Sequence, residues 1–122
     1  RGDPLVLWWV ATWCSSCTYS TQLFAQSYYS QYHSAGVTLL EIESYNDLGQ
    51  SGPSLSSFAS SNGYSGQAGW VFGTGSASGT SSYNPSGYLD YYYAINAQGT
   101  IVAEGADLAG SFSSALQAAT GS

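Results

Sequence analysis

The residues in this chain best suited to chemistry are its only two cysteines, Cys14 and Cys17, in the stretch "VATWCSSCTYS" at positions 10–20. Thiols at this spacing can exchange disulfides, supply part of a metal site, or form a structural disulfide. A structural disulfide across so short a loop would constrain the unfolded chain very little. His33, the only histidine, follows about four helical turns later and is too distant to share an ion with the pair. Redox chemistry is therefore favoured, and we expect no metal and no cofactor.

The sequence around the pair suggests a role for each thiol. Helical periodicity begins at about Ser15 and continues to about Ser34, so Cys14 stands at a helix N-terminus. Unpaired N–H groups and the helix dipole favour an anion there, which predicts Cys14 as the nucleophile and Cys17, one turn later, as the resolving thiol. Ser15 and Ser16 could solvate a Cys14 thiolate. Trp13 is interpreted either as a lid or platform for substrate or as a packing residue.

The remaining elements predict one α/β domain spanning residues 1–122. An apolar run at 4–10 predicts a buried strand, and 37–43 predicts a second strand. The segment 51–63, with Pro53 in its first turn, predicts a helix that stops at Gly63. "YYYAIN" and "TIVAEG" flank "NAQG" (96–99) and predict a hairpin, and Phe112 opens an amphipathic closing helix. The Gly- and Ser-rich stretch 73–82 is interpreted as a loop.

The charge content excludes several function classes. Only 7% of the residues are charged, Arg1 is the single Lys or Arg, and the formal net charge is −6. Nucleic-acid binding and polybasic attachment to lipid both need cationic side chains that this chain lacks. A surface covered by Ser, Gly and Tyr changes charge little in acid, which suggests a protein outside the cytoplasm, secreted or attached to the envelope. Acid exposure is a further hypothesis, and we expect any signal or membrane tether to lie outside this sequence.

Two stretches give the chain a resemblance to a known family. "WVATWCSSC" (9–17) after a buried strand, and "YAINAQGTIV" (93–102) in the hairpin, resemble the thioredoxin superfamily, above all its TlpA-like extracytoplasmic branch. The resemblance implies a thioredoxin-like fold, with a central mixed β-sheet flanked by helices in three α/β/α layers. It also implies thiol–disulfide oxidoreductase activity on protein or small thiols and disulfides, a redox partner protein, and often a membrane tether.

The chain departs from the family pattern at two positions where members of the family carry an acidic side chain near the second cysteine. Many thioredoxins carry a buried Asp six residues before the first cysteine, where this chain has Trp8. TlpA-like proteins often place a Glu three residues after the second cysteine, where this chain has Ser20. No side-chain base is therefore evident near Cys17.

A second departure concerns the cis-proline that normally faces the disulfide. Its expected position is occupied by Asp90, with Leu89 beside it, unless a longer loop brings Pro85 to that place. An ionised Asp90 would disfavour a Cys14 thiolate, whereas a protonated one would not. Tyr88, Leu89 and Tyr91 are predicted to form a substrate-binding edge. The alternative is a redox-inert thioredoxin-like binding module of the cell envelope that uses this edge and keeps a structural disulfide.

Overall fold

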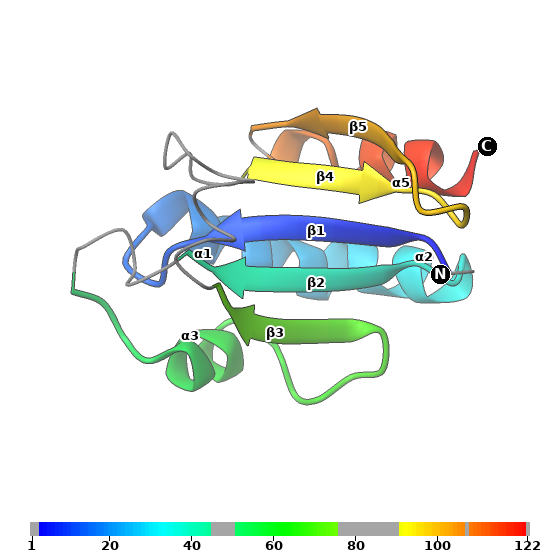
Figure 1. Cartoon of the computed structure of the whole chain (residues 1–122). Coiled ribbons are helices and arrows are strands. Elements are labelled where there is room, and N and C mark those ends of the chain that lie inside the picture. The colour runs from blue at the N-terminus through cyan, green and yellow to red at the C-terminus, as the bar shows by residue number, and fades with distance from the viewer. Residues whose placement is uncertain (1–2, 45–50, 76–90, 107, 122) are drawn as a thin grey trace.

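The computed structural model describes residues 3–44, 51–75, 91–106 and 108–121. The predictions made for Pro85, Tyr88, Leu89 and Asp90 lie outside these residues. What the structure does describe is a single sheet with helices packed against it (Figure 1).

Within the described ranges, the sheet has five strands in the order β3-β2-β1-β4-β5. β2 runs parallel to β1 and β3, whereas β4 runs antiparallel to β1 and β5. This confirms the predicted mixed sheet and the hairpin. The strands are β1 Leu5–Val10, β2 Thr38–Glu43, β3 Trp70–Thr74, β4 Tyr91–Ile95 and β5 Ile101–Gly105.

Strand β3 was not predicted from the sequence. It spans only Trp70–Thr74, and Gly73 lies inside the stretch that was interpreted as a loop. β3 forms because the backbone of β2 offers it a parallel partner, in the register Leu39↔Trp70 to Glu43↔Thr74. Long-range pairing therefore decides this strand, and local sequence pattern does not.

The long helix predicted from Ser15 to Ser34 consists of three consecutive helical segments. These are α1 Ser15–Leu23, a π-helical turn η1 Phe24–Tyr28, and α2 Tyr29–Ser34. The buried side chains along them include Cys17, Phe24 and Tyr32. A π turn inserts extra backbone into the helix, and here it coincides with Tyr28 stacking on Phe112 at 4.9 Å between ring centroids.

Two further helices complete the described part. α3 Leu55–Ser61 begins at the N-cap Ser54, so Pro53 precedes the helix instead of lying in its first turn as predicted. α5 Phe112–Thr120 follows a short 3₁₀ turn, η3 Leu108–Gly110. Phe112, Ala115 and Ala119 are buried, which confirms the predicted amphipathic stripe.

The core lies between the sheet and the helices α1, α2 and α5, which cover one of its faces in Figure 1. Aromatic rings from separate elements meet there: Phe24 contacts Trp70 edge-on at 4.9 Å between centroids, and Trp8 contacts Phe112 at 5.9 Å. Helix α3 lies beside the edge strand β3 (Figure 1). Packing in this core holds α1 against the sheet, and Cys14, its N-cap, follows shortly after the carboxyl end of β1.

Candidate active site at the start of α1

Cys14 is the N-cap residue of α1, which is where the sequence predicted it. Its backbone is extended, with φ −82° and ψ 120°, and a tight turn from Ala11 precedes it. The Cys14 carbonyl accepts the backbone N–H and the hydroxyl of Thr18, both at 3.1 Å. These bonds start the helix at Ser15 and fix the Cys14 side chain over its first turn.

The Cys14 sulfur takes the place that a capping oxygen usually occupies. The backbone N–H of Cys17 donates to Sγ of Cys14 at 3.1 Å, and the Ser16 hydroxyl lies 3.2 Å from the same sulfur. An N–H group at a helix N-terminus stabilises negative charge on the atom it contacts. Of the two serines expected to solvate this sulfur, Ser16 therefore contacts it, whereas the Ser15 side chain is exposed to solvent and the backbone donor is Cys17.

No disulfide joins the two cysteines in this structure, and both lie almost completely inside the protein. Cys14 retains 3% of its surface exposed, and Cys17 retains none. An incoming disulfide can therefore meet Cys14 before Cys17. The geometry is compatible with attack by Cys14 and resolution by Cys17.

The loop before Cys14 is packed tightly against a distant segment. A Cβ added at Gly52 would lie 2.5 Å from Oγ1 of Thr12 and 2.9 Å from the backbone nitrogen of Trp13. Both separations are too short for a real side chain, so only glycine fits at this position. Trp13 itself is half-buried and packs against the core, which fits its interpretation as a packing residue.

A buried carboxyl that the sequence did not single out lies behind α1. Glu41 on β2 is fully buried, and Oγ1 of Thr21 lies 2.6 Å from its Oε2. The same Thr21 hydroxyl lies 2.8 Å from the carbonyl oxygen of Cys17. The sequence signal was the position of Glu41 in the alternating strand pattern, on the same face as the buried Leu39.

Ser20, the position at which the resemblance to TlpA-like proteins would place a glutamate, offers no acidic group. Its side chain is 1% exposed, and its hydroxyl finds no hydrogen-bond partner among the described residues. The acidic side chain behind the pair therefore comes from a neighbouring strand and not from the helix.

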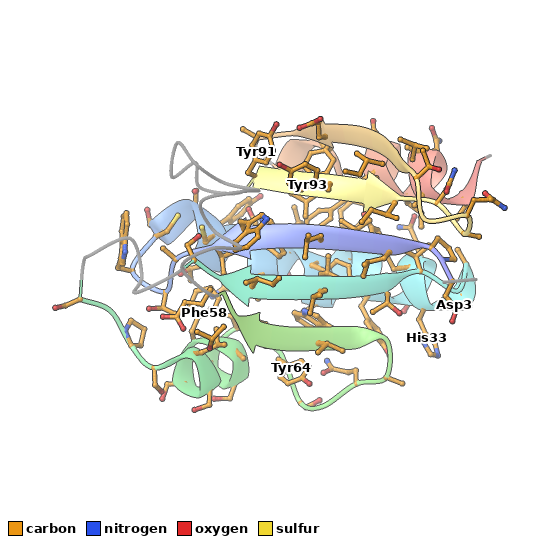
Figure 2. All side chains as sticks on the ribbon, viewed as in Figure 1. Asp3, His33, Phe58, Tyr64, Tyr91 and Tyr93 are labelled. Carbon is orange, nitrogen blue, oxygen red and sulfur yellow. The ribbon has the colours of Figure 1, made fainter. Side chains whose placement is uncertain are left out.

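Of the predicted substrate edge, only Tyr91 belongs to the described residues. It begins β4, pairs with Trp9 near the end of β1, and donates its hydroxyl to Glu104 at 2.7 Å. Figure 2 shows Tyr91 and Tyr93 on the same strand, and their rings are 5.4 Å apart in an edge-on contact. Tyr91 thus lies at the end of the sheet from which the Cys14 loop leaves.

His33 plays no part in this arrangement. It lies in the last turn of α2, exposed and stacked on Tyr29 at 5.5 Å between ring centroids. Figure 2 shows it at the opposite end of the sheet from Tyr91. Within the residues that the structure describes, no group of three or more His, Cys, Asp or Glu side chains could hold a metal ion.

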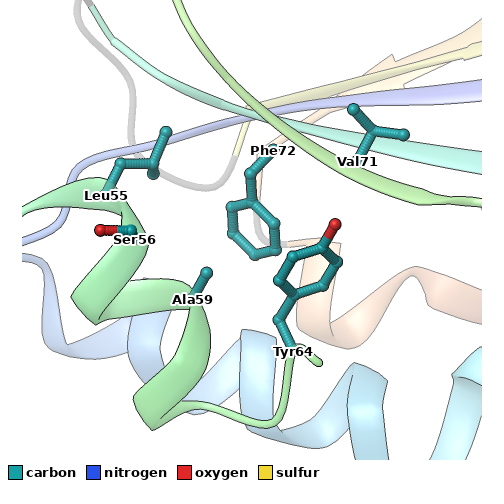
Figure 3. Close-up of a pocket in the computed structure, with 6 residues that line it drawn as sticks. All are labelled: Leu55, Ser56, Ala59, Tyr64, Val71 and Phe72. Atoms are coloured by element: carbon teal, nitrogen blue, oxygen red, sulfur yellow. The ribbon is translucent and has the colours of Figure 1, made fainter. Parts of the chain in front are cut away.

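A shallow apolar groove of about 470 Å³ lies between α3 and β3 (Figure 3). This groove was not predictable from the sequence, because one of its walls is strand β3, which was not predicted. None of its lining residues comes from the cysteine loop, so it is separate from the candidate site. The lining residues are Leu55, Ser56, Ala59, Tyr64, Val71 and Phe72.

Comparison with known proteins gives similarity of structure without similarity of sequence. No protein-family model matches the chain, and no curated protein matches it. A thioredoxin-like protein from Aeropyrum pernix superposes with a TM-score of 0.71 at 20% identity, covering 95% of this chain and 77% of that one.

Two further structures superpose with nearly the same TM-score. A secreted Mycobacterium tuberculosis disulfide oxidoreductase homologous to E. coli DsbE gives a TM-score of 0.69 at 19% identity, covering 97% of this chain and 83% of the other. StoA from Bacillus subtilis gives 0.69 at 17% identity, covering 94% and 83%.

No helix in the described ranges is long and apolar enough to cross a membrane.

Three findings agree on the fold: the mixed sheet with its antiparallel hairpin, the helix that starts just after the first cysteine, and the structural neighbours. This chain has the thioredoxin-like fold.

Proposed function

We propose that this chain is a thiol–disulfide oxidoreductase in which Cys14 attacks and Cys17 resolves. The observation that carries the proposal is the Cys14 sulfur at the N-cap of α1, accepting the N–H of Cys17 at 3.1 Å. A sulfur held by a backbone donor at a helix N-terminus is stabilised as a thiolate, both when it attacks and when it leaves.

The chemistry proceeds in two exchanges. The Cys14 thiolate attacks one sulfur of a substrate disulfide, forms a mixed disulfide, and releases the other substrate sulfur as a thiolate. Cys17 then loses its proton and attacks Sγ of Cys14, which forms the Cys14–Cys17 disulfide and releases the second substrate thiolate. The substrate is reduced by two electrons and the cysteine pair is oxidised by two, and the same steps in reverse oxidise a dithiol.

The similarity in fold to a secreted disulfide oxidoreductase, together with a chain that has one Lys or Arg, supports a role outside the cytoplasm. Its substrates would be protein or small-molecule thiols and disulfides, and a separate redox partner protein would restore the pair after each turnover.

Two single substitutions test the assignment of roles and serve as controls for each other. Cys17→Ser keeps the attacking sulfur but cannot resolve, so it should accumulate a mixed disulfide with a dye-labelled peptide disulfide, visible on a non-reducing gel. Cys14→Ser loses the attacking sulfur and should trap nothing, because Cys17 has no exposed surface. Equal trapping by the two variants, or trapping by neither, would contradict the proposal.

One observation favours the alternative of a redox-inert binding module, namely the near-complete burial of both sulfurs. A module of this kind would keep a structural disulfide for stability, and its sulfurs would exchange with other thiols or disulfides only after unfolding. Trapping by Cys17→Ser under native conditions, at a rate that does not rise with low concentrations of urea, would exclude it.

A further inference from the structure

The residue that the proposed exchange leaves unexplained is Glu41. It lies in the middle of β2, and its Cα is the register partner of Trp8 on β1. Its side chain is fully buried. Burying an ionised carboxyl is costly unless hydrogen bonds and charges compensate it, so a buried glutamate in so weakly charged a chain calls for an explanation.

The hydrogen bonds around Glu41 connect it to the turn of helix that carries Cys17. Trp70 donates its Nε1–H to Oε1 of Glu41 at 3.2 Å, and Oε2 lies 2.6 Å from the Thr21 hydroxyl. That hydroxyl also lies 2.8 Å from the carbonyl oxygen of Cys17. Thr21 and Cys17 are four residues apart in α1, so their side chains lie on the same face of the helix.

The Thr21 hydroxyl has one proton and two acceptors. If it donates to the Cys17 carbonyl, the short contact to Oε2 is a hydrogen bond only when Glu41 is protonated and donates to Thr21. If Glu41 is ionised, the Thr21 proton turns toward the carboxylate and away from Cys17. Both contacts are two-centre hydrogen bonds at the same time only with a proton on Glu41.

We propose that Glu41 is a positioning residue for the resolving thiol, protonated in the resting protein, whose ionisation opposes loss of the proton from Cys17. An ionised Glu41, separated from the Cys17 carbonyl only by the Thr21 hydroxyl in a buried layer of low polarity, disfavours a second negative charge on Cys17. The inference rests on the proposed function, because it concerns the step in which Cys17 attacks.

Other titratable groups of the described residues lie on the same side of the sheet or on the helices that pack there. Tyrosines ordinarily ionise above about pH 10, outside an assay between about pH 5 and 9. Glu43 lies two residues beyond Glu41 and is half-buried, so it is the natural comparison. These groups are Cys14 before α1, Cys17 and Tyr19 on α1, Tyr28 on η1, Tyr29, Tyr32 and His33 on α2, Glu43 on β2, and Tyr92 on β4. Of these, His33 is exposed and lies in the last turn of α2.

The test measures the two exchange steps separately. The reduced wild-type protein is mixed with an aromatic disulfide reagent in a stopped-flow instrument at several pH values. The first release of aromatic thiolate reports attack by Cys14, and the second reports attack by Cys17 on the mixed disulfide. Substitution Glu41→Gln keeps the shape of the protonated side chain, with an amide N–H for Thr21 and an oxygen for Trp70.

Above neutral pH we expect Glu41→Gln to accelerate the second release about tenfold, the effect of one unit in the pKa of a thiol. In Glu41→Gln, the pH dependence of the second release should show one ionisation, that of Cys17. In the wild type it should show two, those of Cys17 and Glu41. Glu43→Gln should change the second release by less than Glu41→Gln does. An unchanged rate in Glu41→Gln would make Glu41 merely structural, and a slower rate would make it a proton acceptor; either result would overturn the proposal, as would an equal acceleration in Glu43→Gln.

The outcome also separates this inference from the proposed function. If the wild-type protein releases no thiolate at all, the oxidoreductase proposal fails and takes this inference with it. If the wild type releases both equivalents but Glu41→Gln behaves as wild type, only the inference fails.

A second measurement applies if Glu41→Gln does not fold. In reduced wild-type protein labelled with ¹³C at the glutamate carboxyls, the Glu41 signal should titrate in steps shared with the Cys17 Cβ signal. Only Glu41, Glu43 and Glu104 contribute to such a spectrum. Independent titration of the two signals would overturn the proposal.

Discussion

At the scale of single residues, polar atoms inside the aromatic core are held by specific partners. Tyr32 is 1% exposed and donates its hydroxyl to the carbonyl oxygen of Phe112 at 2.8 Å, joining α2 to the start of α5. Burial raises the pKa of Tyr32, with smaller contributions in the same direction from Tyr92 and Tyr28. The folded protein therefore holds this proton more tightly than the unfolded chain does.

This difference predicts a pH-dependent effect of Tyr32→Phe. Below about pH 10 both states are protonated, so the wild type should exceed the variant by about 1 kcal/mol in the free energy of unfolding, the worth of the lost hydrogen bond. Above about pH 10 the unfolded wild-type chain releases the proton first, so the advantage shrinks as pH rises. Urea unfolding of both proteins at pH 8 and near pH 11 measures the difference in unfolding free energy. A difference that stays constant between these pH values would contradict the raised pKa of Tyr32.

The environment of a residue could be predicted from the sequence where its partners are close to it in the sequence. The N-cap position of Cys14 follows from the spacing of the pair and the helical pattern after it, and the structure places it there. Glu41 was overlooked because its partners, Thr21 and Trp70, stand 20 and 29 positions away in the sequence. A fold must bring them together before the carboxyl has any relation to Cys17.

At the scale of elements, the active-site loop depends on a segment that carries no chemistry. Gly52 lies against Thr12 and Trp13 so closely that no Cβ fits between them. The segment before α3 therefore forms part of the wall behind the cysteine loop.

Substitution Gly52→Ala should displace that wall. The clash with the Trp13 backbone should cost about 1–3 kcal/mol in unfolding free energy and change the rate at which Cys14 reacts with a thiol reagent. Gly73→Ala in β3 is the matched control, because a Cβ there meets nothing within 4 Å. Urea unfolding and stopped-flow labelling of both variants provide the measurements; equal behaviour of the two would show that the close packing at Gly52 has no consequence.

The elements differ in how far the sequence could predict them. β1, β2, the hairpin and α5 have strong patterns of their own, and the structure confirms them. β3 was missed because five residues containing a glycine become a strand only beside β2. The π turn at Phe24–Tyr28 was missed because its sequence continues the ordinary helical pattern.

At the scale of the whole molecule, the chain is almost without cationic side chains. The entire sequence contains seven acidic residues, one Lys or Arg, and one His. Acid unfolding usually follows the protonation of carboxylates that are paired or hydrogen-bonded in the folded state. A chain with few cations can form few such pairs, and a Glu41 already protonated would lose nothing on acidification.

The fold should therefore survive in acid. We expect near-UV circular dichroism at about pH 3 to match that at pH 7, because few carboxylates are stabilised as anions by the fold. A cooperative loss of signal above about pH 4 would show that ionised carboxylates hold the structure together, and would remove the support for an acid-exposed location.

The measurement that tests the central claim most directly is a redox titration of the whole chain in thiol buffers of defined potential. Tryptophan fluorescence provides the signal, because Trp13 adjoins Cys14. We predict a reversible two-electron transition with a midpoint above roughly −280 mV, within the range of exchanging pairs in this fold. A midpoint below about −300 mV, or reduction that occurs only on unfolding, would make the disulfide structural and contradict the oxidoreductase assignment.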